Sequence, residues 1–280
     1  MEITTLPNDI NTIGSDKIQL YNYKNLNDII KSKINLSKNT ISFLRAGTKE
    51  VMGKGKAEKI DNQSFLIMKS GNCLMTEKVS SPNNFYQSIL LFFDDELAMD
   101  LLEKYDLATI TQPEEKSFFV FKYDDFLLHF VQSLATIIKL PKEAQNALIK
   151  VKFEEMMLYL SAQYGTSFLN SIVQKADDRT SKLTNIVDNN KFNKLTLEEL
   201  AFLCNMSLST FKREFFKVYQ NTPIKWFNEQ RLNHIATLLR THKKRPIDLY
   251  EDAGYENFSN FVQAFKKKFG LTPKQYQNLD

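Results

Sequence analysis

Hydrophobic positions change their spacing once along this chain, near residue 125. Between about residues 17 and 126, short apolar and β-branched runs alternate with Gly, Asn, Asp and Ser. Runs such as TISFLRAG, SFLIMKSG, YQSILLFF and KSFFVFKY predict strands of an antiparallel sheet that closes into a sandwich or barrel. Residues 95–106 have helical spacing instead, and we expect a helix there.

Beyond residue 125 the apolar spacing becomes that of amphipathic helices. Residues 126–138 and 141–165 fit two such helices, with Pro141 in the first turn of the second and Gly165 at its end. The polar stretch 174–182 lacks an apolar face and is the expected linker. The remainder is helical in pattern, so we expect two domains, residues 1–174 and residues 180–280.

The last hundred residues contain a repeat with a constant offset of 50, in which FKREFFKVYQNTPIKWF (211–227) aligns with FVQAFKKKFGLTPKQYQ (261–277). In the first copy, a capping box starting at Thr196 opens a short helix, and Ser207 caps a second helix after a tight turn. In the second copy, Pro246 opens the first helix and Asn257 caps the next one. The pattern predicts an all-α domain of two helix-turn-helix units.

The connecting helix, 223–240, is expected to bury one face made of Ile224, Phe227, Ile235 and Leu238. The second helices of the two units span about 207–219 and 257–269, and each has a Phe pair at i, i+4 that must point inward.

A helix of this kind enters the major groove of DNA by its N-terminal residues. Arg213 suits guanine, and Gln263 or Asn260 suits adenine. Lysines toward the C-terminal ends are better placed for phosphates than for bases. The outward residues expected to contact bases are Ser209, Lys212, Arg213, Ser259, Asn260 and Gln263, and the phosphate contacts are expected from Lys217, Lys266, Lys267 and Lys268.

The charge distribution favours a phosphate-carrying partner for the C-terminal third. Residues 1–175 hold 20 Lys and Arg against 21 Asp and Glu, whereas residues 176–280 hold 17 against 12. No apolar run is long enough for a membrane span, and the first residues lack the features of a signal peptide. Cys73 and Cys204 are expected to stay unpaired in a reducing compartment, the cytoplasm.

Candidate catalytic chemistry is sparse. The three histidines, His129, His234 and His242, lie outside the expected strands, which argues against a metal-dependent cupin enzyme. We expect His129 in a helix core and the other two at the surface. No phosphate-binding loop or nucleophile elbow occurs. The sequence therefore predicts no enzyme activity, no cofactor and no metal.

The C-terminal segments resemble the AraC/XylS family of bacterial transcription regulators over residues 180–280. LTLEELAFLCNMSLSTFKREF, WFNEQRLNHIATLL and GYENFSNFVQAFKKKFGLTPKQY carry the resemblance. The segments ISFLRAGTKEV, SFLIMKSGNCLMTEK and ILLFFDDELAMDLLEKY are more weakly similar to the cupin-type regulatory domains of such proteins. The implied fold class is α+β, with an N-terminal cupin-like β-barrel and helical dimerisation segment before an AraC-type DNA-binding domain.

The resemblance implies an activator or repressor that binds operator or promoter DNA, contacts RNA polymerase and is controlled through its N-terminal domain. Gln263 replaces a commonly basic residue, and Tyr250 replaces a small Ala at a helix crossing, which would tilt the second unit. The residues that match the base-contacting faces of the family are Ser209, Lys212 and Arg213 in the first recognition helix, and Phe258, Ser259 and Gln263 in the second.

Alternatives remain for both domains. The C-terminal domain could instead dock a protein partner or bind DNA without sequence preference. The controlling signal could be a small molecule or a regulatory protein. The helix at 141–164 is expected to pair two subunits through Leu148, Val151 and Met156, which could equally pack onto the barrel. An apolar ligand in the barrel, or simply a packed core, would involve Phe43, Leu44, Phe65, Ile67 and Met68.

Overall fold

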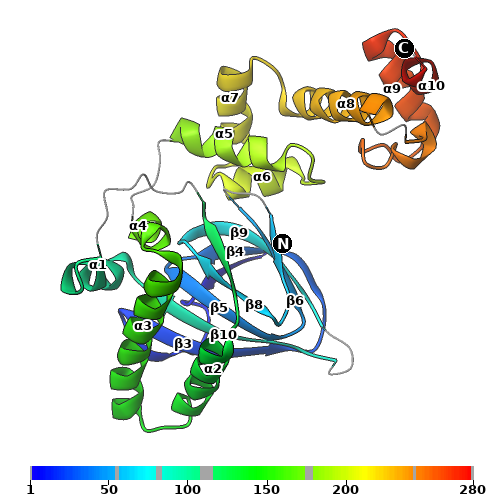
Figure 1. Cartoon of the computed structure of the whole chain (residues 1–280). Helices are drawn as coiled ribbons and strands as arrows, with labels where there is room; N and C mark the ends of the chain where they lie inside the picture. Colours follow the sequence, from blue (N-terminus) through cyan, green and yellow to red (C-terminus); the bar gives the residue numbers. More distant parts are fainter. Residues whose placement is uncertain are drawn as a thin grey trace. The chain divides into compact units, whose positions relative to one another are not determined.

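The computed structural model describes residues 2–53, 57–79, 84–107, 116–173, 179–241 and 244–278, without the side chain of residue 179. The chain divides into two compact units, Met1–Asp178 and Arg179–Asp280 (Figure 1). Residues 174–178 of the expected linker, and His242, lie outside the described residues. Residues 179–182 of that linker are instead the start of a helix, α5 (Arg179–Asn190).

Two β-sheets form the first unit, with strand orders β1-β4-β9-β6-β7 and β11-β8-β5-β10-β3-β2. Strands β1 and β4 are parallel, and the other ladders are antiparallel. The strands are β1 (Ile3–Leu6), β2 (Ile13–Ser15), β3 (Ile18–Asn25), β4 (Ile29–Leu36), β5 (Asn39–Ala46), β6 (Thr48–Met52), β7 (Glu58–Ile60), β8 (Ser64–Met68), β9 (Gly71–Lys78), β10 (Tyr86–Phe93) and β11 (Phe118–Lys122).

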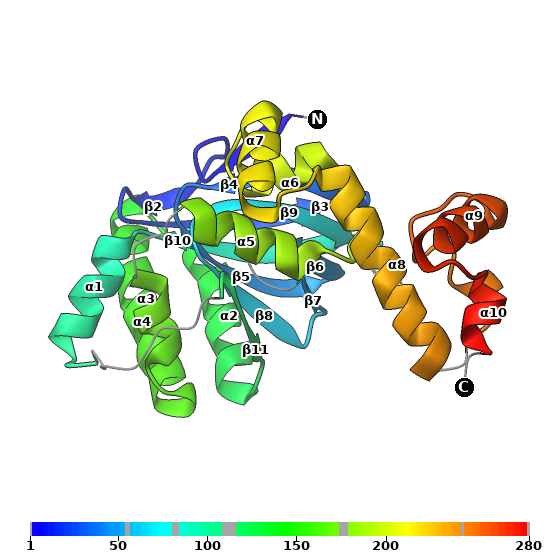
Figure 2. The same cartoon turned by 90° about the horizontal axis from the view of Figure 1, so that it is seen from above.

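The expected closed barrel is not formed. Among the described strands, β7 and β11 are sheet edges, and no hydrogen-bonded ladder joins the two sheets. The six-stranded sheet packs on helices through one face and on the five-stranded sheet through the other (Figures 1 and 2). Both faces of its central strands are therefore buried, so all five residues of β8 (SFLIM) are buried and the last four are apolar without alternation.

Strand alternation separates the five residues expected to line a barrel interior. Successive side chains of a strand point to opposite faces of the sheet. Phe43, Phe65 and Ile67 accordingly pack against the helices, whereas Leu44 and Met68 face the other sheet. The five residues therefore line no common interior and belong to two separate cores.

In the described part of the first unit, four helices accompany the sheets: α1 (Asp95–Lys104), α2 (Asp125–Ile137), α3 (Lys142–Tyr164) and α4 (Ser167–Val173). The first three match the expected segments, although Pro141 precedes the first turn of α3 as its N-cap instead of lying in it. His129 is exposed on α2, so the prediction of a core histidine is wrong. The apolar character of the helix suggested burial of this histidine, but α2 turns Leu127, Phe130 and Leu134 inward instead.

The residues expected to form a dimer seam on α3 separate into two groups. Met156 is fully buried in the core that α3 shares with the sheet. Leu148 and Val151 are 39% and 59% exposed. Met156 is therefore unavailable for a contact between subunits, and only the other two residues present apolar surface.

The second unit consists of helices. The short α-helix expected after Pro246 is not formed. Residues 246–254 instead form a 3₁₀ turn, η1, followed by further turns. Phe227 and Ile235 of α8 are buried as expected, whereas Ile224 is 63% exposed. The helices are α5 (Arg179–Asn190), α6 (Leu197–Leu203), α7 (Leu208–Tyr219), α8 (Pro223–Thr241), η1 (Pro246–Asp248), α9 (Phe258–Phe269) and α10 (Pro273–Gln277).

None of the helices in the described parts of the chain is long and apolar enough to cross a lipid bilayer. Cys73 and Cys204 are both free and buried, and burial raises the pKa of each thiol to about 12. A thiol with such a pKa stays protonated at neutral pH and is a poor nucleophile.

A buried ion pair lies between the two sheets. Lys49 of β6 and Glu77 of β9 are directly opposite across the ladder, and their Nζ and Oε1 atoms are 3.4 Å apart. Both side chains are almost fully buried, and Lys49 Nζ also donates a hydrogen bond to Ser42 Oγ at 3.1 Å. Burial of one charge without the other is costly, so each partner is needed to hold the other.

We expect Glu77→Ala to lower the free energy of unfolding by about 3–5 kcal/mol, because the Lys49 ammonium would remain buried without its counter-charge. Replacing both partners, by Lys49→Met with Glu77→Leu, should recover most of that loss. Urea denaturation of the three proteins measures the effect. A single variant as stable as the parent would show that water or a rearranged side chain replaces the carboxylate.

Candidate nucleic-acid interface

The rotation of α7 about its axis is set by two buried phenylalanines. Ser207 caps the helix by accepting a hydrogen bond from the Thr210 amide at 3.2 Å. Phe211 and Phe215 are fully buried, with ring centres 5.7 Å apart. Phe215 also packs against Phe227 of α8, at 5.9 Å. These contacts hold the opposite side of α7 toward solvent.

The α9 helix repeats this construction. Asn257 caps it through a 2.9 Å hydrogen bond from the Asn260 amide. Phe261 and Phe265 are fully buried and 5.8 Å apart, and they pack on the C-terminal half of α8. α7 of the first helix-turn-helix copy therefore packs at one end of α8, and α9 of the second copy packs toward its other end (Figure 1).

The ring contacts around the two Phe pairs agree closely in the two copies. Phe215 lies 5.6 Å from Trp226 with an interplanar angle of 80°. The equivalent pair, Phe265 and Tyr276, lies at 5.4 Å and 78°. The repeat detected from the sequence is therefore a repeat of packing as well.

Most sequence-predicted site residues lie on the exposed sides of these two helices. Lys268 does not: it is half-buried, its Nζ donates to the Glu229 carbonyl at 2.8 Å, and burial lowers its pKa. Phe258 is also half-buried and packs on Tyr250 and Phe261 instead of facing outward. The exposed residues are Ser209, Lys212, Arg213 and Lys217 on α7, and Ser259, Asn260, Gln263, Lys266 and Lys267 on α9.

A carboxylate lies within the cationic face of α7. Glu214 Oε1 accepts hydrogen bonds from Arg213 Nε and from Lys217 Nζ, each at 3.0 Å. These two cations lower the pKa of Glu214. The bond from Arg213 uses only one of the five N–H groups of its guanidinium, so the side chain keeps donors for a ligand. At the equivalent position of α9 the residue is Ala264.

Sequence reasoning overlooked one residue on the outward side of α7. Phe216 is 51% exposed, and it follows Ser209, Lys212 and Arg213 by seven, four and three positions. Those spacings place it on their side of the helix. Its position in the same helical stripe was a usable signal, but an apolar side chain alone does not distinguish a core contact from a ligand contact.

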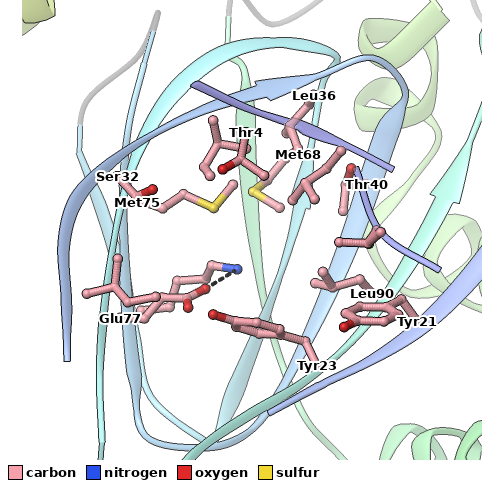
Figure 3. A pocket seen from close by; sticks show the side chains of 15 residues that line it. Thr4, Tyr21, Tyr23, Ser32, Leu36, Thr40, Met68, Met75, Glu77 and Leu90 are labelled. Carbon is pink, nitrogen blue, oxygen red and sulfur yellow. Dashed lines mark ion pairs between the residues drawn. The ribbon is translucent and has the colours of Figure 1, made fainter. Parts of the chain in front are cut away.

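The first unit contains a cavity of about 160 Å³ between the two sheets. The Lys49–Glu77 ion pair lies at one side of it, near Tyr23, and aliphatic and thioether groups form much of the remaining lining (Figure 3). Burial and the Glu77 carboxylate raise the pKa of Tyr23. The cavity thus combines an apolar lining with one hydrogen-bonding region. Among the described residues, no group of three His, Cys, Asp or Glu is placed to hold a metal ion.

Two protein families match the sequence. The ExsA N-terminal regulatory domain matches residues 39–172, and a helix-turn-helix domain matches residues 200–279. These matches include β5 through α4 in the first unit, and both outward helix faces in the second.

Curated relatives are transcription regulators. The chain is 28% identical over 161 residues to the thermoregulatory protein LcrF of Yersinia pestis, covering 57% of this chain and 59% of LcrF. It is 27% identical over 126 residues to the HTH-type transcriptional regulator ExsA of Pseudomonas aeruginosa, covering 45% of each chain. The match thus spans less than two thirds of these relatives.

A solved structure of apo ToxT from Vibrio cholerae aligns with 95% of this chain and 98% of its own, with a TM-score of 0.44 and 12% identity.

Proposed function

We propose that this chain, which combines an AraC-type helix-turn-helix domain with an ExsA-type N-terminal regulatory domain, is a sequence-specific DNA-binding regulator of transcription. The observation that carries the proposal is the pair of outward faces on α7 and α9. Each helix has its own buried Phe pair, which directs this face outward, and each face carries polar and cationic side chains.

In this mechanism α7 and α9 enter successive major grooves and contact base edges near their N-terminal halves. Arg213 would donate two hydrogen bonds to guanine, and Asn260 or Gln263 would pair with adenine. Ser209, Lys212 and Ser259 lie beside them. Phosphate contacts supply affinity without sequence preference, and we assign them to Lys217, Lys266 and Lys267.

We assign different roles to the two domains. The N-terminal domain, residues 1–174, would receive the signal, and the domain at 180–280 would bind operator or promoter DNA in the cytoplasm. RNA polymerase would be the partner through which bound protein changes transcription. Relatives named as transcriptional regulators, VirF and ExsA, support this division.

The DNA-binding proposal predicts a motif that depends on both recognition helices. Genomic fragments captured by the full chain should share a motif that the Arg213→Ala, Gln263→Ala double variant fails to enrich. Loss of two base-specific contacts should weaken binding to that motif by ten-fold or more, since each good bidentate pair contributes about 1–3 kcal/mol. Fluorescence anisotropy on a motif duplex measures the change.

A matched control is Arg240→Ala, which removes the same charge from an exposed position of α8. It should keep the motif. Affinity of the parent should fall by orders of magnitude between ~50 and ~200 mM salt, because phosphate contacts release counterions. Equal capture of all genomic fragments by the parent and by the double variant would contradict sequence-specific recognition. A weak salt dependence of the affinity would favour a protein partner.

We also propose that α3 pairs two subunits. Leu148 and Val151 are three positions apart, so they lie on one side of the helix, and both are exposed. Burial of such a pair against its copy removes apolar surface from water on both chains.

We expect Leu148→Asp with Val151→Asp to give a folded monomer, because both positions are exposed and surface substitutions change stability little. Met156→Asp should instead unfold the first unit, since Met156 is fully buried. Light scattering gives the oligomeric state, and circular dichroism reports folding. A double variant that remains dimeric would refute the assignment.

The inter-sheet cavity supports a second proposal, a small-molecule effector. Its volume of about 160 Å³ is similar to the ~150 Å³ of a dry protein cavity that holds one benzene-sized ring. The ion pair at its side favours a ligand that is apolar apart from one hydrogen-bonding group, such as an N–H that donates to Glu77. The alternative effector is a regulatory protein.

Indole should therefore raise the melting temperature of the full chain in a saturable way, because a ligand that binds only the folded state stabilises it. Ser32→Phe, which places a ring at the cavity wall, should abolish the rise. Free tryptophan, with the same ring and two charges, should have no effect. An equal response of parent and variant would place indole elsewhere and contradict this use of the cavity.

A further inference from the structure

Phe216 is an apolar side chain on an otherwise polar surface of α7. At about 100° per residue it lies between Lys212 and Arg213 around the helix, close to the direction of Ser209. It is 51% exposed. Phe211, Phe215, Tyr219, Trp226 and Phe227 form a chain of ring contacts in this unit, and among the described ring contacts Phe216 takes part in none.

The internal repeat supplies a comparison for this position. With the offset of 50, Phe216 corresponds to Lys266 of α9, which is also exposed. The inward residues of the two helices are the same, Phe at both positions of each pair. The two copies therefore present this site in the same direction but with different chemistry, an apolar ring in one and an ammonium in the other.

The major groove offers one apolar group for such a ring. Adenine, guanine and cytosine present only hydrogen-bond donors and acceptors there, whereas thymine presents a 5-methyl group beside its O4 acceptor. A phenyl side chain makes no hydrogen bond with a phosphate, so it gains most by removing that methyl group and itself from water.

We propose that Phe216 is a specificity-determining residue that contacts the 5-methyl group of a thymine in the half-site bound by α7. The inference rests on the proposed function of α7 as a recognition helix. Lys266 at the same place in α9 is the residue assigned to a phosphate, a contact without base preference. Only the half-site of α7 therefore requires a thymine here, and the operator is asymmetric at this position.

The surroundings of Phe216 fit DNA better than a protein partner. Its exposed neighbours on the helix surface, three or four positions away, are Lys212, Arg213 and Gln220. The other exposed apolar residue of α7, Val218, lies about 200° away around the helix. The two therefore form no contiguous apolar patch of the kind that protein interfaces use.

The test uses the full chain and a duplex obtained by repeated selection from a random library. Each thymine of the α7 half-site is replaced in turn by deoxyuridine, which removes only the methyl group. We expect one replacement to weaken binding of the parent about four-fold, the value for one buried methyl-sized group. Phe216→Ala should bind the thymine duplex correspondingly less tightly and no longer distinguish thymine from uracil at that position.

Two further comparisons sharpen the result. Placing 5-methylcytosine at the same position should recover more affinity than cytosine for the parent only. Phe216→Lys, which gives α7 the residue of α9, should select a duplex without the thymine. Val218→Ala is the matched control, because it removes apolar surface from the opposite side of the same helix and should leave every preference unchanged.

The outcomes separate this inference from the function on which it rests. Failure to select any motif would contradict sequence-specific binding and this inference with it. A selected motif with Phe216→Ala retaining the full thymine-to-uracil ratio would overturn only the role of Phe216. If Phe216→Ala lost transcriptional output but kept its DNA affinity and its thymine-to-uracil affinity ratio, Phe216 would be assigned to a protein contact. That result would likewise overturn the proposal.

Discussion

The candidate DNA-binding surface depends on two pairs of phenylalanines spaced four residues apart. Phe211 with Phe215, and Phe261 with Phe265, are the fully buried side chains of α7 and α9. Because a helix is rigid, burial of one side determines the direction of every other side chain on it. Removal of either pair from the core would leave the outward residues without a defined direction.

The local signals at the helix ends act together with this constraint. Ser207 and Asn257 accept backbone hydrogen bonds at the first turns of α7 and α9, so both helices begin at the same place relative to their Phe pairs. Position along the axis and rotation about it are thus set by different interactions. A pairing of polar side chains with base edges requires both.

The first unit follows another constraint, because its central sheet is covered on both faces. One face packs on α1 to α4, and the other packs on the second sheet. A buried ion pair, Lys49 with Glu77, lies in the second interface beside a cavity. A charged pair at that depth is balanced only while both strands keep their register. This interface, with its ion pair and cavity, is the place proposed for a small-molecule effector.

Much of the DNA-binding unit was determined by the sequence itself. Caps, tight turns and the inward Phe pairs are local signals, since each involves residues within about one or two helical turns. The repeat, with its offset of 50, shows the same local signals twice. Those signals correctly predicted the helices Leu208–Tyr219 and Phe258–Phe269 and the exposure of Arg213 and Gln263. The local signals gave no role to Phe216, because nothing in the sequence around a single apolar residue distinguishes a core contact from a ligand contact.

Only the tertiary structure decided which faces meet. Phe43 and Leu44 are neighbours in sequence but belong to different cores, because the sheet has a covering layer on each side. Met156 is buried while Leu148 is exposed, although both lie on the same helix. Lys268 folds back on Glu229 while Lys266 and Lys267 stay exposed. These outcomes depend on partners distant in sequence, which periodicity along one segment does not specify.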